Sequence, residues 1–178
     1  AEAAARAEGG RFIVRMEDID VGRCRPSFDA AILDDLSWLG LSWEEPIRRQ
    51  SEHLDDYAAA LDEMRHLGLL YPCFCTRKDI QAEIAAAGQA PHGPDGPLYP
   101  GTCRALSSGE RERRINEESP FALRLDMEKA TALTGALTWH SPGGDPIEAQ
   151  PQVFGDVVLA RKDVPTSYHL AVTVDDHL

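Results

Sequence analysis

Three cysteines and one tyrosine are spaced as the ligands of a single metal ion could be. Cys73 and Cys75 are separated by one residue, and Tyr99 stands four positions before Cys103. Zinc takes about four ligands in a tetrahedron and favours thiolates and imidazoles. The fourth ligand could be His92, which is the better-matched type, or Tyr99, whose phenolate is an unusual zinc ligand. Three buried free thiols are the alternative interpretation of this spacing.

A group of carboxylates forms a second candidate site. Glu17, Asp18 and Asp20 directly follow the apolar run at residues 11–16. Three carboxylates within four positions repel one another, so they require a cationic partner. They could bind the ammonium group of a substrate or a metal ion, or pair with neighbouring arginines. A solvated turn with helix-capping aspartates is the alternative.

A third polar group lies near the end of the sequence. Tyr168 and His169 precede the segment Asp175-Asp176-His177. A histidine near carboxylates can act as a base or ligate a metal, although it can equally serve as a structural hydrogen-bonding group. No glycine-rich phosphate loop and no serine-centred nucleophile motif accompanies these residues. The residues alone therefore indicate polar sites without fixing a reaction.

The segments between these groups predict alternating helices and strands. Ser27 and Ser51 are expected to cap two helices that end at Gly40 and Gly68, and Thr76 to open a third. Residues 166–178 fit either a helix or a strand. Further helices are expected at 1–8 and 110–118, strands at 11–16, 69–75, 121–126, 136–140 and 156–161, and a long loop at 85–101.

This order of elements favours an α/β domain with a largely parallel sheet. The run at 11–16 is expected to be a buried strand, and the helix after Ser27 to pack one apolar face, formed by Phe28, Ile32, Leu36 and Leu39. Catalytic groups of such sheets lie beyond the carboxyl ends of the strands. Glu17 and Asp18 are predicted to lie there.

The composition excludes several classes of protein. The chain has 178 residues, of which 43% are hydrophobic, with 18 Lys and Arg against 30 Asp and Glu. We expect one core, no membrane-spanning segment, and a reducing cytoplasm in which four cysteines do not form a disulfide scaffold. A net charge of −12 gives no general attraction to nucleic acid, so RNA binding would need a local patch. Arg77, Lys78 and Arg104 could form one.

Six motifs taken together carry more information than each alone. The motifs are GGRFIVRMEDID (9–20), ILDDLSWLGLSWEEPIRRQSEHLDDY (32–57), GLLYPCFCTRKDI (68–80), LYPGTCR (98–104), GDVVLARKD (155–163) and PTSYHLAVTVDDHL (165–178). In this order they resemble the catalytic core of the class I glutamyl-tRNA synthetases. The Glu-Asp-Ile-Asp form of the first motif, and the segment Cys75–Ile80, fit the shortened members that modify tRNA(Asp) better than the full-length ones.

The resemblance implies a Rossmann-type catalytic core, partly present, with an inserted zinc-binding subdomain. It divides the chain into a core segment at 1–72, a zinc-bearing insertion at 73–126 and a return to the core at 127–178. It also implies an enzyme that activates L-glutamate with ATP and transfers it to queuosine at the wobble position of tRNA(Asp). The expected partners are L-glutamate, ATP and queuosine-containing tRNA(Asp), and the expected state is a cytoplasmic monomer.

The family's binding residues map onto six positions of this sequence. Glu17 would hold the α-ammonium group of glutamate, and Tyr168 would offer its hydroxyl to the same amino acid. The zinc ligands would be Cys73, Cys75, Tyr99 and Cys103, which favours Tyr99 over His92.

The resemblance also places the family's ATP-binding signatures outside residues 1–178. The chain is therefore expected to be an internal part of the catalytic core that does not activate glutamate unaided. Two alternatives remain: a fragment of a glutamyl-tRNA synthetase that charges the tRNA 3′ end, or a non-catalytic, zinc-stabilised binding module.

Overall fold

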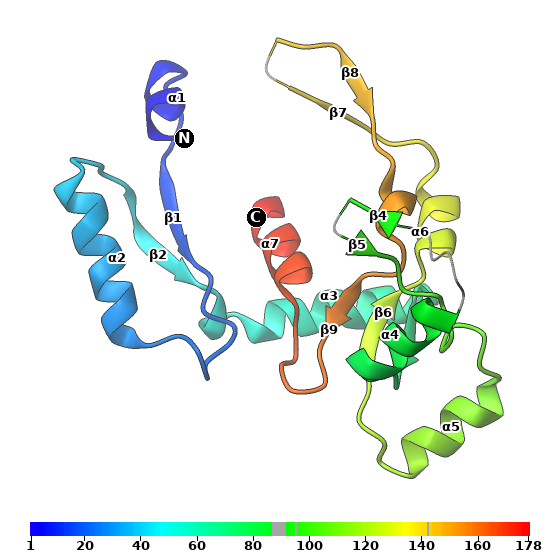
Figure 1. Ribbon diagram of the computed structural model, residues 1–178. Coiled ribbons are helices and arrows are strands. Elements are labelled where there is room, and N and C mark those ends of the chain that lie inside the picture. Colours follow the sequence, from blue (N-terminus) through cyan, green and yellow to red (C-terminus); the bar gives the residue numbers. More distant parts are fainter. Residues whose placement is uncertain (87–91, 95, 142) are drawn as a thin grey trace.

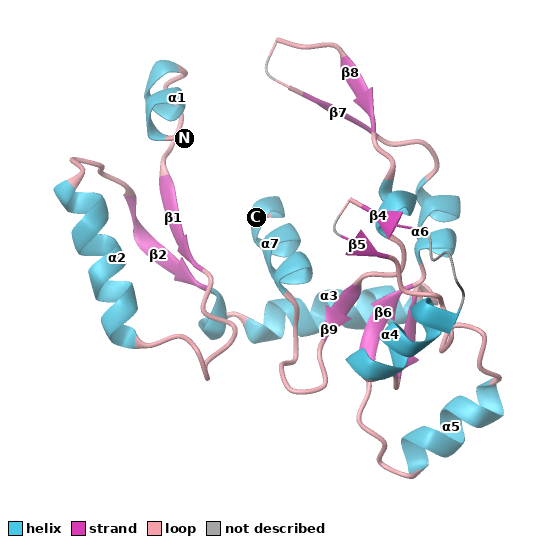
Figure 2. Ribbon diagram, viewed as in Figure 1, coloured by secondary structure: helices cyan, strands magenta, loops and turns pink. Residues whose placement is uncertain are grey.

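The computed structural model describes residues 1–86, 92–94, 96–141 and 143–178 (Figure 1). Its helices and strands alternate along the chain (Figure 2). The α-helices are α1 (Glu2–Ala7), α2 (Pro26–Trp38), α3 (Leu54–His66), α4 (Arg77–Ala86), α5 (Ser108–Asn116), α6 (Met127–Thr134) and α7 (Tyr168–His177), and the 3-10 helices are η1 (Gln50–Glu52) and η2 (Pro151–Phe154). The strands are β1 (Ile13–Met16), β2 (Glu44–Arg49), β3 (Leu70–Cys73), β4 (His92–Gly93), β5 (Gly96–Pro97), β6 (Ala122–Leu125), β7 (Thr138–His140), β8 (Pro146–Glu148) and β9 (Val158–Ala160).

The strands form four small sheets, and the expectation of a largely parallel sheet is wrong. Strands β1 and β2 pair in parallel, whereas β3, β6 and β9 form an antiparallel sheet in that order. The remaining pairs, β4–β5 and β7–β8, are antiparallel. Helices α4 and α5 lie in the excursion between β3 and β6, so they do not act as crossovers between parallel strands. Alternation along the sequence therefore did not indicate strand direction.

Two helices do not begin at the serine residues that were predicted to cap them. Helix α2 begins at Pro26 with Arg25 as its N-cap, so Ser27 is not the cap. Proline suits the first helical position because its missing amide hydrogen would have no partner there. Ser51 lies in η1, before α3. The ambiguous segment 166–178 is the helix α7, which is capped by Ser167.

The predicted capping box at the start of α4 is confirmed. The Asp79 amide donates to the Thr76 hydroxyl oxygen at 3.2 Å, and the Thr76 amide donates to the Asp79 carboxylate at 2.7 Å. These bonds satisfy two amide hydrogens that the first helical turn leaves without partners. The same carboxylate bonds lower the pKa of Asp79.

The main core lies where α3, α7 and β9 meet. Its buried members include Tyr57 and Leu61 of α3, Leu159 of β9 and Ala171 of α7. The run at 11–16 is a strand but not a buried one, because Met16 is buried while Ile13 is 63% exposed.

The apolar face of α2, which was expected to pack against the rest of the protein, is instead largely exposed to solvent. Phe28, Ile32 and Leu39 are all exposed in the described structure. Within the described residues, no helix is long and apolar enough to pass through a lipid bilayer.

The segment expected as a long loop contains short regular structure. Residues 87–91 and 95 lie outside the described residues, but β4 and β5 pair within the segment. A Cβ atom at Gly93 would lie 2.4 Å from the carbonyl oxygen of Val153 and 2.6 Å from the side chain of Leu98. Only glycine lets the backbone approach η2 this closely.

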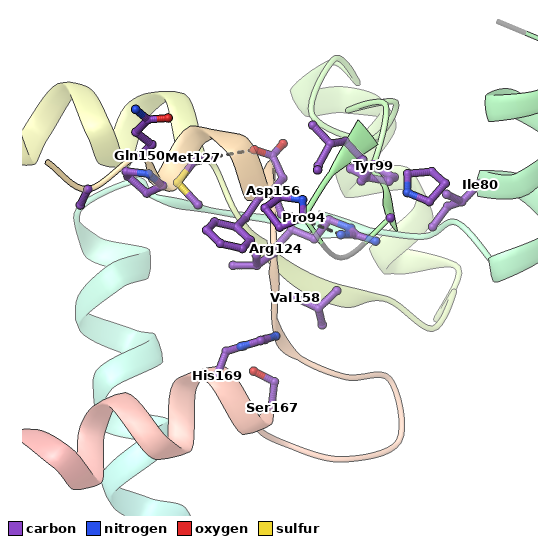
Figure 3. A pocket seen from close by; sticks show the side chains of 18 of the residues that line it. Ile80, Pro94, Tyr99, Arg124, Met127, Gln150, Asp156, Val158, Ser167 and His169 are labelled. Carbon is purple, nitrogen blue, oxygen red and sulfur yellow. Dashed lines mark hydrogen bonds between the residues drawn. The ribbon is translucent and has the colours of Figure 1, made fainter. Parts of the chain in front are cut away.

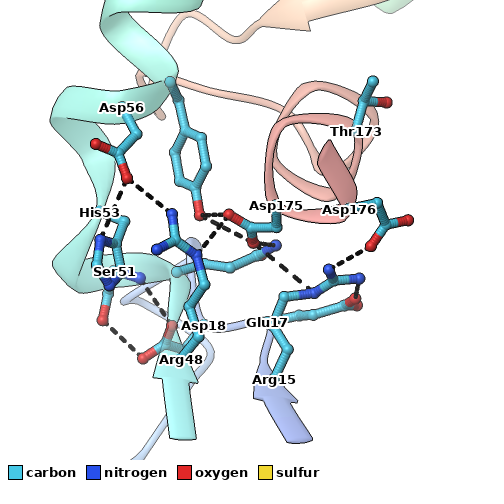
Figure 4. Close-up of polar contacts among 12 residues, drawn as sticks. Arg15, Glu17, Asp18, Arg48, Ser51, His53, Asp56, Thr173, Asp175 and Asp176 are labelled. Carbon is cyan, nitrogen blue, oxygen red and sulfur yellow. Dashed lines mark hydrogen bonds and ion pairs between the residues drawn. The ribbon is translucent and has the colours of Figure 1, made fainter. Parts of the chain in front are cut away.

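One buried carboxylate joins helix α7 to three other elements of the structure. The Asp175 side chain, on α7, is 1% exposed. It accepts hydrogen bonds from Arg48 Nε at 2.8 Å, Gln50 Nε2 at 2.9 Å and the Tyr57 hydroxyl at 3.0 Å (Figure 4). Because these donors lie on β2, η1 and α3, a single anion fixes α7 against all three.

The donors around Asp175 also set the ionisation of its carboxylate. Burial alone would raise the pKa of Asp175, but the bonds from Gln50, Arg48 and Tyr57 outweigh burial and lower it. Burial and the nearby carboxylate raise the pKa of Tyr57 to about 12, so its hydroxyl stays a donor at neutral pH.

We expect Asp175→Asn to lower the free energy of unfolding by about 3 kcal/mol at pH 7, because it removes one partner of a buried charge pair. The lowered pKa of Asp175 means that this contribution is complete above the unfolded value of about 3.9 and is lost as the pH falls through the folded value. Urea denaturation of both proteins from pH 7 to pH 3 should therefore show a narrowing difference. The control is Asp176→Asn, whose side chain is 65% exposed and should cost less than about 1 kcal/mol. Equal losses from the two variants would contradict the role of Asp175.

Candidate active site and cysteine cluster

The acidic cluster follows β1, and its first member is held by an arginine. Arg15 donates to Asp176 at 2.6 Å and to Glu17 at 3.4 Å (Figure 4). The Glu17 side chain remains 41% exposed, so its carboxylate is oriented but open to a second cation. Glu17 thus lies beyond the carboxyl end of a parallel strand, as predicted.

The other two carboxylates of the cluster have structural partners. Asp18 accepts hydrogen bonds from the amide of Ser51 at 2.8 Å and from its hydroxyl at 2.7 Å. Asp20 lies 3.5 Å from the guanidinium group of Arg161 and 3.7 Å from that of Arg23. Arginine pairing and turn capping therefore account for these two residues.

The third polar group is divided between two ends of one helix. Tyr168 begins α7 and is 52% exposed, whereas Asp175 and Asp176 lie in its last turn. Asp175 and Asp176 bind arginines, so they serve as structural hydrogen-bonding groups. Among the described residues, the only cluster of histidine, cysteine or carboxylate groups with metal-binding geometry is the one formed by the cysteines.

The structure brings the three cysteines and Tyr99 together. The sulfur atoms of Cys73, Cys75 and Cys103 all lie within 4.8 Å of one another. The Tyr99 hydroxyl lies 3.4 Å from the sulfur of Cys73 and 3.6 Å from that of Cys75, and the sulfurs of Cys75 and Cys103 are 3.4 Å apart. The side chain of His92 is outside the described residues.

These separations fit one tetrahedral ion. Zinc–sulfur bonds of about 2.3 Å and zinc–oxygen bonds of about 2.0 Å give tetrahedral edges of about 3.8 Å and 3.5 Å. The observed separations of 3.4–3.6 Å are close to those edges. All four cysteines of the chain are free thiols, so the donor set suits zinc chemically.

The surroundings of the cluster act differently on its members. Burial raises the pKa of Cys75 to about 12 and also raises the pKa of Tyr99. For Cys103, burial is outweighed by hydrogen bonds from Tyr99 and from the Phe74 amide, which lower the pKa. Arg124 lies 3.9 Å from the centre of the Tyr99 ring. Burial therefore opposes ionisation of Cys75 and Tyr99, whereas the donors around Cys103 favour its thiolate.

A second buried carboxylate, which the sequence did not single out, connects this cluster to the antiparallel sheet. Asp156 accepts hydrogen bonds from the Tyr71 hydroxyl at 2.6 Å and from the Met127 amide at 3.0 Å. Arg104 lies 3.3 Å from the same carboxylate. Arg104 is thus paired with a buried carboxylate, although its own side chain remains 39% exposed.

A pocket of about 850 Å3 opens beside the cysteine cluster (Figure 3). Tyr99 and Arg124 line one part of it, and Ser167 and His169 line another. Ser167 and His169 are the two neighbours of Tyr168 in the sequence. The pocket therefore lies between the two groups of residues that the sequence singled out.

The fold and these residues agree with one family of enzymes. Residues 3–178 match the family model described as tRNA synthetases class I (E and Q), catalytic domain. The chain therefore belongs to the catalytic-domain family of the class I tRNA synthetases of the glutamate and glutamine type.

Two relatives named Glutamyl-Q tRNA(Asp) synthetase are particularly similar. The one from Rhodobacter capsulatus is 44% identical over 97% of this chain and 63% of its own length, and the one from Deinococcus radiodurans is 44% identical over 98% and 54%. A protein of Coprothermobacter proteolyticus named Glutamate--tRNA ligase is 34% identical over 97% and 36%. The chain thus spans less than two thirds of the length of these curated relatives.

The solved structures support the fold. A glutamate tRNA ligase from Elizabethkingia meningosepticum, in complex with its amino acid, superposes with a TM-score of 0.73 at 24% identity. It covers 99% of this chain, which covers 37% of that protein. The overall architecture is therefore that of a class I synthetase catalytic domain, as the resemblance implied.

Proposed function

We propose that this chain is part of an enzyme that activates L-glutamate with ATP and transfers it to queuosine at the wobble position of tRNA(Asp). The observation that carries the proposal is 44% identity, over 97% of the chain, to a relative named for this reaction. In the first step, the glutamate carboxylate attacks the α-phosphorus of ATP and releases pyrophosphate. In the second, a hydroxyl of queuosine attacks the glutamyl carbonyl, and AMP leaves.

Two residues are proposed to bind the amino acid. The exposed carboxylate of Glu17, oriented by Arg15, is suited to the α-ammonium group of glutamate. Tyr168, which begins α7 and is half exposed, would offer its hydroxyl as a donor or acceptor to the same substrate. These contacts would hold glutamate so that its carboxylate points away from the anion at position 17.

The cysteine cluster is proposed to hold zinc through Cys73, Cys75, Tyr99 and Cys103. The metal would serve structurally, because all four positions are taken by the protein and none is open for a substrate. Cys73 ends β3, and the chain returns at Tyr99 and Cys103 after a segment with little apolar content. A zinc ion would therefore fasten the two ends of that excursion.

The remaining features of the proposal concern organisation. We propose a core segment at 1–72, a zinc-bearing insertion at 73–126 and a return to the core at 127–178, with the sheet β3–β6–β9 linking all three. We also propose a cytoplasmic monomer.

The second candidate function is that of a glutamyl-tRNA synthetase that charges the tRNA 3′ end, supported by the weaker 34% identity to a glutamate–tRNA ligase. The third, a non-catalytic zinc-stabilised module, would show no glutamate activation.

The first prediction concerns glutamate binding. In the full-length protein, Glu17→Gln should raise the KM for glutamate roughly tenfold to a hundredfold, because a charged hydrogen bond contributes about 1.5–3 kcal/mol. Glutamate-dependent exchange of pyrophosphate into ATP measures this constant. Asp20→Asn is the matched control, since Asp20 pairs with Arg23 and Arg161. An unchanged KM in the Glu17 variant would remove this residue from the site.

The second prediction concerns the metal. Protein purified without added metal should contain one zinc per chain by elemental analysis, and Cys103→Ser should lose most of it because one of four ligands is gone. Cys24→Ser should keep its zinc, because Cys24 lies outside the cluster. Absence of zinc from the unmodified protein, or full zinc in the Cys103 variant, would refute the assignment.

The third prediction concerns the acceptor. Labelled glutamate and ATP should label tRNA(Asp) that contains queuosine, and mild base should release the label because the product is an ester. Matched tRNA(Asp) lacking queuosine should stay unlabelled. Labelling of tRNA(Glu) would instead place the protein among the ordinary glutamyl-tRNA synthetases.

A further inference from the structure

The pocket beside the cysteine cluster has no role in the proposed function so far, although one proposed zinc ligand, Tyr99, lines it. Its volume of about 850 Å3 lies within the range of about 300–1,000 Å3 that is typical of small-molecule sites. Most of its wall is apolar. The apolar lining residues include Leu98, Met127, Trp139, Phe154, Val157 and Val158.

The place of the pocket relates it to the reaction. Ser167 and His169 line it, and Tyr168 between them is the proposed contact to glutamate. A group bound in the pocket would therefore lie near the first turn of α7, which carries Tyr168. Tyr99 lines the opposite part of the wall, so the pocket extends from the amino-acid site to the cysteine cluster (Figure 3).

The lining combines flat aromatic surface with polar groups. Trp139 and Phe154 are 50% and 46% exposed, so each ring keeps a surface on which another ring can stack. Gln150 and His169 contribute polar side chains to the lining, and the Arg161 guanidinium at the wall is paired with Asp163 at 2.8 Å and with Asp20 at 3.5 Å. Unstacked RNA bases are recognised in this manner, by stacking on aromatic side chains and hydrogen bonding at their edges.

We propose that this pocket receives the acceptor nucleoside of the RNA, with its base stacked on Trp139 and Phe154. The assignment rests on the proposed function and identifies the residues that select the second substrate. The pocket would hold the acceptor hydroxyl beside the activated glutamate, and Gln150 and His169 would bind the edge of the base. The adenine of ATP is the competing occupant.

The test compares the two steps of the reaction in the full-length protein. Trp139→Ala and Phe154→Ala should each raise the KM for queuosine-containing tRNA(Asp) roughly fivefold to a hundredfold, as expected for the loss of one stacking partner. The KM values for glutamate and ATP in pyrophosphate exchange should change less than about twofold. Trp139→Phe should restore most of the RNA affinity, because it retains a ring. Trp38→Ala is the matched control, since Trp38 is 84% exposed and lies outside the pocket.

The possible outcomes separate this proposal from the proposed function. A raised KM for ATP in the Trp139 and Phe154 variants would assign the pocket to ATP, and an unchanged KM for the RNA would overturn the proposal directly. Should the unmodified protein charge tRNA(Glu) instead, the same comparison with that RNA tests the pocket independently. Equilibrium binding of the RNA provides a second readout that requires no transfer, and thermal unfolding shows whether each variant is folded.

Discussion

The Asp175 carboxylate is the constraint on which the arrangement of the site depends. An anion that is almost completely buried must be matched by donors, and here the donors come from β2, η1 and α3. Its neighbour Asp176 binds Arg15, which in turn contacts Glu17. The last turn of α7 therefore sets the position of the carboxylate at the end of β1. The first turn of the same helix carries Tyr168, so one helix relates both proposed glutamate contacts.

Asp156 is a second buried carboxylate that links several elements, here around the antiparallel sheet β3–β6–β9. It joins Tyr71 of β3, the start of α6 and Arg104, which directly follows the last cysteine of the cluster. Arg124 of β6 donates to the Asp156 carbonyl oxygen and also covers the ring of Tyr99. The cysteine cluster and the pocket wall thus share their supports. A substitution in the cysteine cluster should therefore also shift the pocket wall, because Arg124 contacts both.

The sequence predicts those features whose causes are local. Thr76 and Asp79 are three residues apart, and their capping box forms as expected. The grouping of Cys73, Cys75 and Cys103 was predicted from the shared chemistry of their thiols, although Cys103 lies 28 residues after Cys75. Features that depend on distant partners were missed. Asp175 meets donors more than a hundred residues earlier, and nothing in its own neighbourhood indicates them. The hydrophobic periodicity of a segment does not show which other segment packs against it. It therefore predicted neither the strand directions in the sheet β3–β6–β9 nor the exposure of the apolar face of α2.

Gly93 gives the region between Cys75 and Tyr99 an unequal tolerance to change. The composition of this region, rich in glycine, proline and alanine, suggests that substitutions there are neutral. At Gly93, however, even a methyl group would collide with the backbone of Val153, and backbone cannot move aside as a flexible side chain can. Gly96 is constrained for a different reason, because its φ of +117° is a backbone conformation that residues with a side chain rarely adopt. Substitutions at these two glycines should therefore be tolerated poorly, and a library that randomises both positions would lose most of its folded members there.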